Sequence, residues 1–303
     1  MAEGDRLEQT VPLVAPDGYV LGATLFEGAA GTTPRHAATI CGGAAIPARA
    51  YRHFAAWLAA RGVPVLTYDN RGIGASRPPR MSGFRAAFED WSDYDCAAAI
   101  AWLRGHYPGS QLIGIGHSIG GFVLASARNA EMLDRLLFIA THTGYWGDYH
   151  PRWRWLLAIM WHGVMPAITR LCGYFPGRAL GLGADIPADF AGQWARRRTP
   201  AVRYEGERAE ACLARCRRLQ GRALALTFTD DAFATAQGTR RVLEHLPGVT
   251  AEHRMIAPRD AGLASIGHFG FFRASAGKSL WPAVGDWILQ QGNPNEKGAE
   301  APF

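Results

Sequence analysis

Residues 115–121 read "IGHSIGG" and place Ser118 between two glycines, directly after an apolar run. The run before them, residues 111–115, is strand-like, and the stretch 122–127 has no turn residue and suits a helix. Gly116 and Gly120 tolerate close backbone approach and unusual φ at such a sharp corner. The spacing G-x-S-x-G is that of a nucleophile elbow, in which the serine Oγ projects at the top of a sheet.

Apolar runs alternate with helical patterns on both sides of this turn. Residues 49–61 and 91–107 suit helices, with a further helix after Ser118, and the strand-like runs are 10–15, 19–26, 36–41, 63–68, 111–115 and 135–140. This alternation predicts an α/β fold with a mainly parallel central sheet and helices on both faces.

The pattern changes at residues 143–218, which lack strand-length β-branched runs and carry many aromatic side chains, among them Trp153 and Trp161. Strands return at 223–228 and 249–256, followed by helical patterns near 237–245 and 280–290. The sequence therefore predicts a core of residues 1–142 and 219–292 and an inserted helical cap, 143–218. The polar, Pro- and Gly-containing tail, 293–303, is predicted to be disordered.

A serine hydroxyl needs a neighbouring base, usually histidine, and a carboxylate that orients that base. Asp230 and Asp231 follow the strand 223–228, and His268 follows the strand that ends at residue 256. Either aspartate suits the role, although such a pair also forms Asx turns. The chain order serine, acid, histidine predicts a catalytic triad.

The oxyanion hole needs backbone N–H donors beside the serine. Ile119 follows Ser118 directly, and the small residues of "CGGAAIP" at 41–47 offer Ala44 or Ala45 as the second donor. We expect His117 to pack beside the elbow. His142 lies near the cap entrance, where it could touch substrate, and no histidine or cysteine cluster predicts a metal site.

The composition excludes several other classes. The net charge is +6, but the arginines are scattered, so we expect no nucleic-acid partner. The five cysteines have no spacing typical of a disulfide framework, which indicates reduced thiols. The N-terminus is polar and no long uncharged apolar stretch is present, so the sequence predicts a cytoplasmic protein without an integral membrane segment.

The glycine loops at 72–77 and 114–119 lack the third glycine of a dinucleotide-binding fingerprint, so we expect no dinucleotide cofactor there. The sequence gives no indication of the oligomeric state.

The motifs "YDNRGIGAS" (68–76), "GIGHSIGG" (114–121), "TDDAF" (229–233) and "IGHFGFF" (266–272), in this order, resemble the α/β-hydrolase superfamily. More narrowly, the chain is similar over about residues 10–290 to a bacterial group of predicted α/β-hydrolases related to serine aminopeptidase-like and lysophospholipase-like enzymes. The resemblance implies an α/β-hydrolase fold and acyl hydrolysis without a cofactor. It also implies Ser118 as nucleophile, Asp231 as acid and His268 as base. One departure is Thr235, where many relatives have proline after the acid.

The expected function is therefore serine-dependent hydrolysis of a small-molecule carboxylic ester, with an apolar acyl or alcohol group contacting Trp153 and Trp161. Acyl transfer or thioester cleavage on the same triad is the alternative, and a non-catalytic binding module is the alternative from another class. Both tryptophans could equally be cap core.

Overall fold

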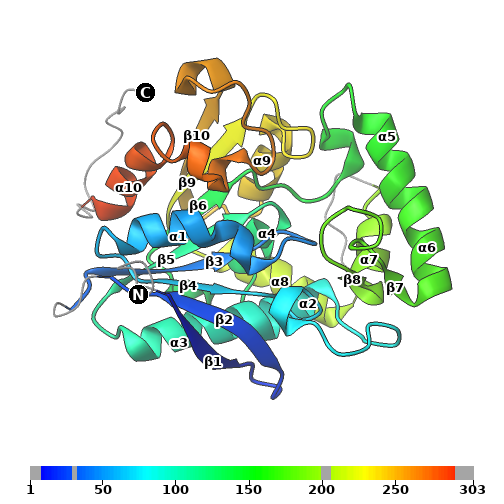
Figure 1. Cartoon of the computed structure of the whole chain (residues 1–303), viewed down its shortest axis with the longest axis horizontal. Coiled ribbons are helices and arrows are strands. Elements are labelled where there is room, and N and C mark those ends of the chain that lie inside the picture. Colours follow the sequence, from blue (N-terminus) through cyan, green and yellow to red (C-terminus); the bar gives the residue numbers. More distant parts are fainter. Residues whose placement is uncertain (1–7, 29–32, 199–205, 291–303) are drawn as a thin grey trace.

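An eight-stranded sheet runs through the centre of the molecule (Figure 1), and the computed structural model describes residues 8–28, 33–198 and 206–290. The strands are β1 (Glu8–Val14), β2 (Val20–Phe26), β3 (His36–Cys41), β4 (Val65–Tyr68), β5 (Gln111–His117), β6 (Arg135–Ile139), β9 (Gly221–Phe228) and β10 (Val249–Ile256). Their order in the sheet is β1-β2-β4-β3-β5-β6-β9-β10. The pairs β1–β2 and β2–β4 are antiparallel and all the others are parallel, as the sequence predicted.

The central strands β3, β4, β5 and β6 are buried on both sides, whereas the edge strands β1 and β10 expose many of their residues. In β5, for example, Leu112 packs into one cluster of buried residues while Ile113 and Ile115 pack into the other. This alternation follows from the two-residue period of a strand. The core helices are α1 (Arg52–Ala59), α2 (Phe88–Asp90), α3 (Ala97–His106), α4 (Ile119–Ala125), α9 (Ala236–Leu243) and α10 (Trp281–Leu289). Helices cover both faces of the sheet, with α1 and α10 on one side and α3 on the other (Figure 1).

Between β6 and β9 the chain leaves the sheet and forms a separate group of helices (Figure 1, at the right). The group contains α5 (Arg154–Ile159), a π-helical segment (Met160–Val164), α6 (Met165–Cys172) and α7 (Ala188–Ala195), together with the two-residue strands β7 (Tyr174–Phe175) and β8 (Ile186–Pro187). These helices lie beside one end of the sheet (Figure 1), and we propose that they form the cap.

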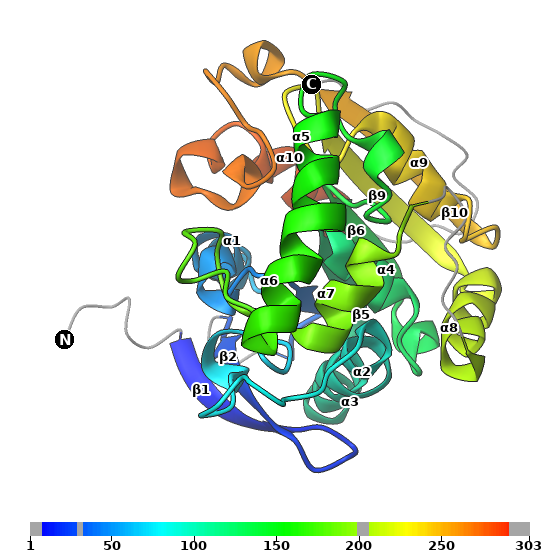
Figure 2. The ribbon, with the colours of Figure 1, turned by 90° about the vertical axis from the view of Figure 1, so that its right-hand side faces the viewer.

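Helix α8 (Glu207–Arg218), which the predicted cap 143–218 includes, lies apart from α5–α7 (Figure 2). Its Arg208 and Arg215 both pair with the buried carboxylate of Asp93, in the segment that leads into α3. We therefore propose that α8 belongs with the core and that the cap ends before it. The tail predicted to be disordered, 293–303, lies outside the described residues.

A continuous helix of 19 residues, Arg154–Cys172, is long and apolar enough to cross a membrane by length and composition alone. The sequence analysis expected no such stretch because it required uncharged residues, and Arg154 and Arg170 stand near the two ends of this helix. Within its apolar window 17% of the residues are buried, and Trp155 and Leu171 are among the exposed side chains. The core thus buries its apolar residues in layers, whereas the cap leaves an apolar helix face exposed.

Candidate active site

Ser118 occupies the sharp turn between β5 and α4. Its own backbone adopts φ 57° and ψ −133°, a conformation that a residue with a side chain rarely takes. The sequence predicts an unusual φ at the flanking glycines, but in the structure the positive φ belongs to the serine. The glycines instead allow neighbouring backbone segments to approach closely. A Cβ on Gly116 would collide with Gly121, and a Cβ on Gly120 would collide with the carbonyl oxygens of residues 41 and 42.

The turn brings Ser118 to His268 and Asp231, which come from two later loops at the same end of the sheet. Ser118 Oγ lies 2.9 Å from His268 Nε2, and His268 Nδ1 lies 2.8 Å from Asp231 Oδ2. All three side chains are buried. The structure thus assembles the three residues that the sequence singled out, in one continuous hydrogen-bonded line.

Asp231 is held as a carboxylate by its surroundings. Burial raises its pKa, but the charge of His268 and the hydrogen bond to it, with further bonds from the backbone, bring the pKa below its ordinary value. The backbone N–H groups of Phe233 and Ala234 donate to Oδ1, which leaves Oδ2 for the imidazole. A carboxylate on Nδ1 makes that nitrogen the protonated one, so Nε2 is free to accept the serine proton.

His117, next to the serine, is buried and makes two hydrogen bonds. Its Nε2 donates to the carbonyl of His268 over 2.8 Å, and its Nδ1 accepts from Tyr51 Oη over 3.0 Å. The Tyr51 hydroxyl in turn accepts the N–H of Gly43 at 3.0 Å. His117 thereby ties the backbone of the histidine loop to the loop at 41–47. Burial, with the nearby charge of His268, lowers the pKa of His117 to about 3, so the ring is neutral.

The loop at 41–47 passes directly over the serine. A Cβ on Gly43 would lie 2.9 Å from the Ser118 Cβ, so this approach requires glycine. The Gly43 N–H is already bonded to Tyr51, whereas within the described residues the N–H groups of Ala44 and Ala45 donate no hydrogen bond. Ile119 begins α4, and the first N–H groups of a helix have no partner inside it. The three predicted oxyanion donors thus stay available.

A second histidine also reaches the serine. His142 Nε2 lies 3.1 Å from Ser118 Oγ, and its Nδ1 accepts the N–H of Gly144 at 3.0 Å. The sequence predicts His142 near the cap entrance but does not link it to the nucleophile. The signal that could have found it is its position three residues after β6, which pairs with β5 in parallel, so both strands end at the same edge of the sheet.

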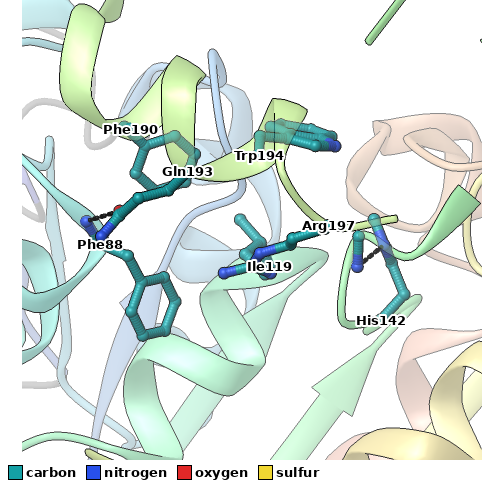
Figure 3. A pocket seen from close by; sticks show the side chains of 8 residues that line it. Phe88, Ile119, His142, Phe190, Gln193, Trp194 and Arg197 are labelled. Carbon is teal, nitrogen blue, oxygen red and sulfur yellow. Dashed lines mark hydrogen bonds between the residues drawn. The ribbon is translucent and has the colours of Figure 1, made fainter. Parts of the chain in front are cut away.

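A small cavity lies next to Ile119 and His142 and is shown in Figure 3. It is nearly filled by side chains, since its free volume of about 10 Å³ holds about one water molecule and is far below the 300 Å³ or more of typical ligand pockets. Its lining combines aromatic rings from α2 and α7 with a few polar groups: Phe88, Ile119, His142, Gly144, Phe190, Gln193, Trp194 and Arg197.

Neither predicted substrate contact, Trp153 or Trp161, lines this cavity. Trp161 is buried and stacks on Trp194, with 5.0 Å between the ring centroids, so it stands directly behind the cavity wall. Trp153 is 43% exposed and lies under the guanidinium of Arg152. An aromatic-rich sequence does not reveal which rings face the nucleophile, because helix orientation depends on packing.

The motif "YDNRGIGAS" has a supporting role in the structure. Asp69 accepts the N–H groups of Ala48 and Ala75, and so ties the loop that follows β4 to the end of the 41–47 loop. Arg71 forms ion pairs with Asp17 and with the fully buried Asp95. These contacts give the motif a structural role, since they fix the loop that follows β4. Groups of three or more metal-ligating side chains are absent from the described residues.

Comparisons with known proteins agree with this architecture. A soluble variant of monoglyceride lipase from Saccharomyces cerevisiae is similar, with a TM-score of 0.65 at 14% identity over 93% of this chain and 96% of that one. An esterase of Pyrococcus furiosus matches with a TM-score of 0.58 at 13% identity, covering 93% and 89%. A monoacylglycerol lipase of Paleococcus ferrophilus matches with a TM-score of 0.54 at 16% identity, covering 88% and 98%. At such identities the likeness concerns the fold alone.

The comparison with curated proteins gives no match. A family model described as serine aminopeptidase, S33, matches residues 32–185, which is about half of the chain and includes the elbow. The match, the parallel sheet and the strand-to-helix turn at Ser118 agree with one another. The chain is therefore a hydrolase of the α/β-hydrolase superfamily and belongs to its serine aminopeptidase S33 family.

Proposed function

We propose that the protein hydrolyses carboxylic esters through an acyl-enzyme on Ser118. The observation that carries the proposal is the unbroken line from Ser118 Oγ to His268 Nε2 at 2.9 Å and from His268 Nδ1 to Asp231 at 2.8 Å. A serine hydroxyl bonded to an imidazole that a buried carboxylate orients is the arrangement that activates serine as a nucleophile.

In the first half of the reaction, Ser118 Oγ attacks the acyl carbon while His268 Nε2 takes its proton. The carbonyl oxygen becomes an oxyanion and accepts hydrogen bonds from the backbone N–H groups of Ile119 and of Ala44 or Ala45. His268 then protonates the leaving alcohol, and the acyl group remains on Oγ. Water repeats the sequence in the second half and releases the acid.

We place the acyl group at the cavity beside Ile119, where Phe88, Phe190 and Trp194 supply aromatic walls. The free volume of about 10 Å³ is too small for an acyl chain as the side chains stand. Binding therefore requires the aromatic side chains of α7 to move, and a compact acyl group requires the smaller movement.

Peptide hydrolysis from a free amino terminus, which the family description names, fits this cavity poorly. An aminopeptidase must bind the substrate ammonium, and a carboxylate is the side chain that does so best. Arg197 lines the cavity, and none of the described residues along its wall is acidic. The charge beside the nucleophile is therefore of the wrong sign for that substrate.

The test combines a fluorophosphonate probe with a panel of p-nitrophenyl esters and acyl-CoA thioesters of increasing chain length. We expect covalent labelling of the wild type and turnover of short esters. Ser118→Ala should fold, should not label, and should lose about five to six orders of magnitude in kcat, as removal of a triad serine does. A wild type that does not label is a binding protein, and preference for CoA esters favours thioester cleavage.

A further inference from the structure

The hydrogen positions around Ser118 follow from the groups at the two ends of its hydrogen-bond chain. At one end the backbone N–H of Gly144 can only donate, so His142 Nδ1 accepts and carries no proton. A neutral imidazole then bears its proton on Nε2, which faces Ser118 Oγ at 3.1 Å. At the other end a carboxylate accepts from His268 Nδ1, so His268 Nε2 accepts from the serine hydroxyl.

One arrangement of protons satisfies every hydrogen bond in the row that runs from Gly144 through Ser118 to Asp231. Gly144 N–H donates to His142 Nδ1, and His142 Nε2–H donates to Ser118 Oγ. The Ser118 hydroxyl donates to His268 Nε2, and His268 Nδ1–H donates to Asp231. Burial, which disfavours the charged imidazolium, lowers the pKa of His142 to about 3, so the ring keeps this neutral form at ordinary pH. The serine oxygen thus lies between one imidazole that takes its proton and one that gives it a hydrogen bond.

We propose that His142 is a further catalytic residue that donates a hydrogen bond to Ser118 Oγ and stabilises negative charge on that atom. The inference rests on the proposed acyl-enzyme mechanism. Oγ gains negative charge when its proton passes to His268, and a donor aimed at a developing charge in a buried site stabilises the transition state.

The same donor acts in both halves of the reaction. During acylation Oγ is the nucleophile and forms the bond to the acyl carbon. During deacylation that bond breaks, Oγ leaves with the electron pair, and it regains the proton from His268. A hydrogen bond from His142 favours the negatively charged Oγ in each case, so it assists both steps without itself giving up a proton.

Three variants separate this role from simple packing. In His142→Asn the amide oxygen can replace Nδ1 as acceptor for Gly144, but the side chain is too short to reach Oγ. In His142→Gln the amide nitrogen can take the place of Nε2 and keep the donor. His53→Asn is the matched control, since the side chain of His53, on α1, is exposed to solvent.

The measurements are the rate of fluorophosphonate labelling at Ser118 and kcat/KM for p-nitrophenyl acetate, with folding checked by thermal denaturation. A hydrogen bond to a charged atom contributes enough that we expect His142→Asn to lose roughly 10- to 100-fold in both rates. His142→Gln should recover most of that loss, and His53→Asn should equal the wild type. KM should change less than kcat, since the donor acts on the serine.

Two outcomes overturn the inference while the proposed function stands. One is a folded His142→Asn that labels and turns over as fast as the wild type. The other is a His142→Gln as slow as His142→Asn, which would assign the loss to packing. A wild type that neither labels nor turns over esters overturns the proposed function itself, and this inference with it.

Discussion

The carboxylates of Asp230 and Asp231, neighbours in sequence, hold different parts of the same histidine loop. Asp231 Oδ2 meets His268 Nδ1 at 2.8 Å, whereas Asp230 accepts the backbone N–H groups of Ile266 and Gly267, both at 2.9 Å. Asp230 therefore binds the backbone of the loop that precedes His268. Thr235, four positions after Asp231, caps α9 by accepting the N–H of Gly238.

The first prediction follows from these different roles of the two aspartates. Asp231→Asn should lose at least about a hundredfold more activity than Asp230→Asn, because an amide at 231 can neither fix the imidazole tautomer nor stabilise its positive charge. An amide at 230 keeps an acceptor oxygen for one of the two N–H groups. The measurement is kcat/KM on a short ester, with both variants shown to be folded. Greater damage from Asp230→Asn would place the acid one residue earlier.

The glycines of the elbow give a second outcome. Gly120→Ala should destabilise the protein by several kcal/mol or displace the elbow. A Cβ at this position collides with backbone carbonyl oxygens, and no change of side-chain rotamer can relieve that clash. Gly105→Ala is the matched control, since Gly105 lies within α3 and a Cβ there meets nothing within 4 Å. Replacement of a helical glycine by alanine should add about 0.5–1 kcal/mol to the free energy of unfolding.

Urea denaturation of the two glycine variants measures the difference. Equal stabilities would mean that the elbow backbone relaxes and that the close approach of α4 to the loop at 41–47 is not needed for folding.

The third outcome concerns the aromatic cap. Trp194→Ala enlarges the cavity directly, and Trp161→Ala removes the ring that supports Trp194. Both should shift the preferred ester toward longer acyl chains, Trp194→Ala more strongly, because apolar contacts discriminate by about 1–3 kcal/mol. Trp153→Ala serves as the control, since its ring is 43% exposed. A chain-length profile that changes most in Trp153→Ala would place the acyl site on the other side of α5.

The fourth outcome is a pH dependence of stability. His117 and His142 have pKa values of about 3 when folded, against 6.5 in the unfolded chain. Between these values the unfolded state binds protons that the folded state does not, so the free energy of unfolding falls as the pH falls from about 6.5 toward 3. Each histidine contributes up to ~1.4 kcal/mol per pH unit in this window.

His117→Gln and His142→Asn each remove one of these groups. In urea denaturation between pH 7 and pH 5, each variant should show a shallower loss of stability than the wild type, whatever its absolute stability. Slopes parallel to that of the wild type would mean that the buried rings take up protons in the folded state.

Much of the fold could be predicted from the sequence because its signals are local. A strand of alternating or continuous apolar residues and a helix with a 3.6-residue period are readable in a short window. The elbow is likewise local, since Gly116, Ser118 and Gly120 lie within five residues. The chain order of serine, aspartate and histidine, each after a strand, also needed no coordinates, because parallel strands present their carboxyl ends at one edge.

The tertiary structure alone determines contacts between segments that lie far apart in the sequence, because no short stretch of sequence contains both partners. His142 reaches Ser118 because β5 and β6 are neighbours in the sheet. The family resemblance implied Asp231 as the acid, but the physical choice between Asp230 and Asp231 follows from the loop backbone, which directs only the Asp231 side chain to His268. The positions of the tryptophans likewise could not be predicted from the sequence, since helix packing places Trp194 in the cavity wall and Trp153 at the surface. Local sequence therefore determined the elements and the order of the reactive groups, whereas packing over long separations selected the side chains that meet.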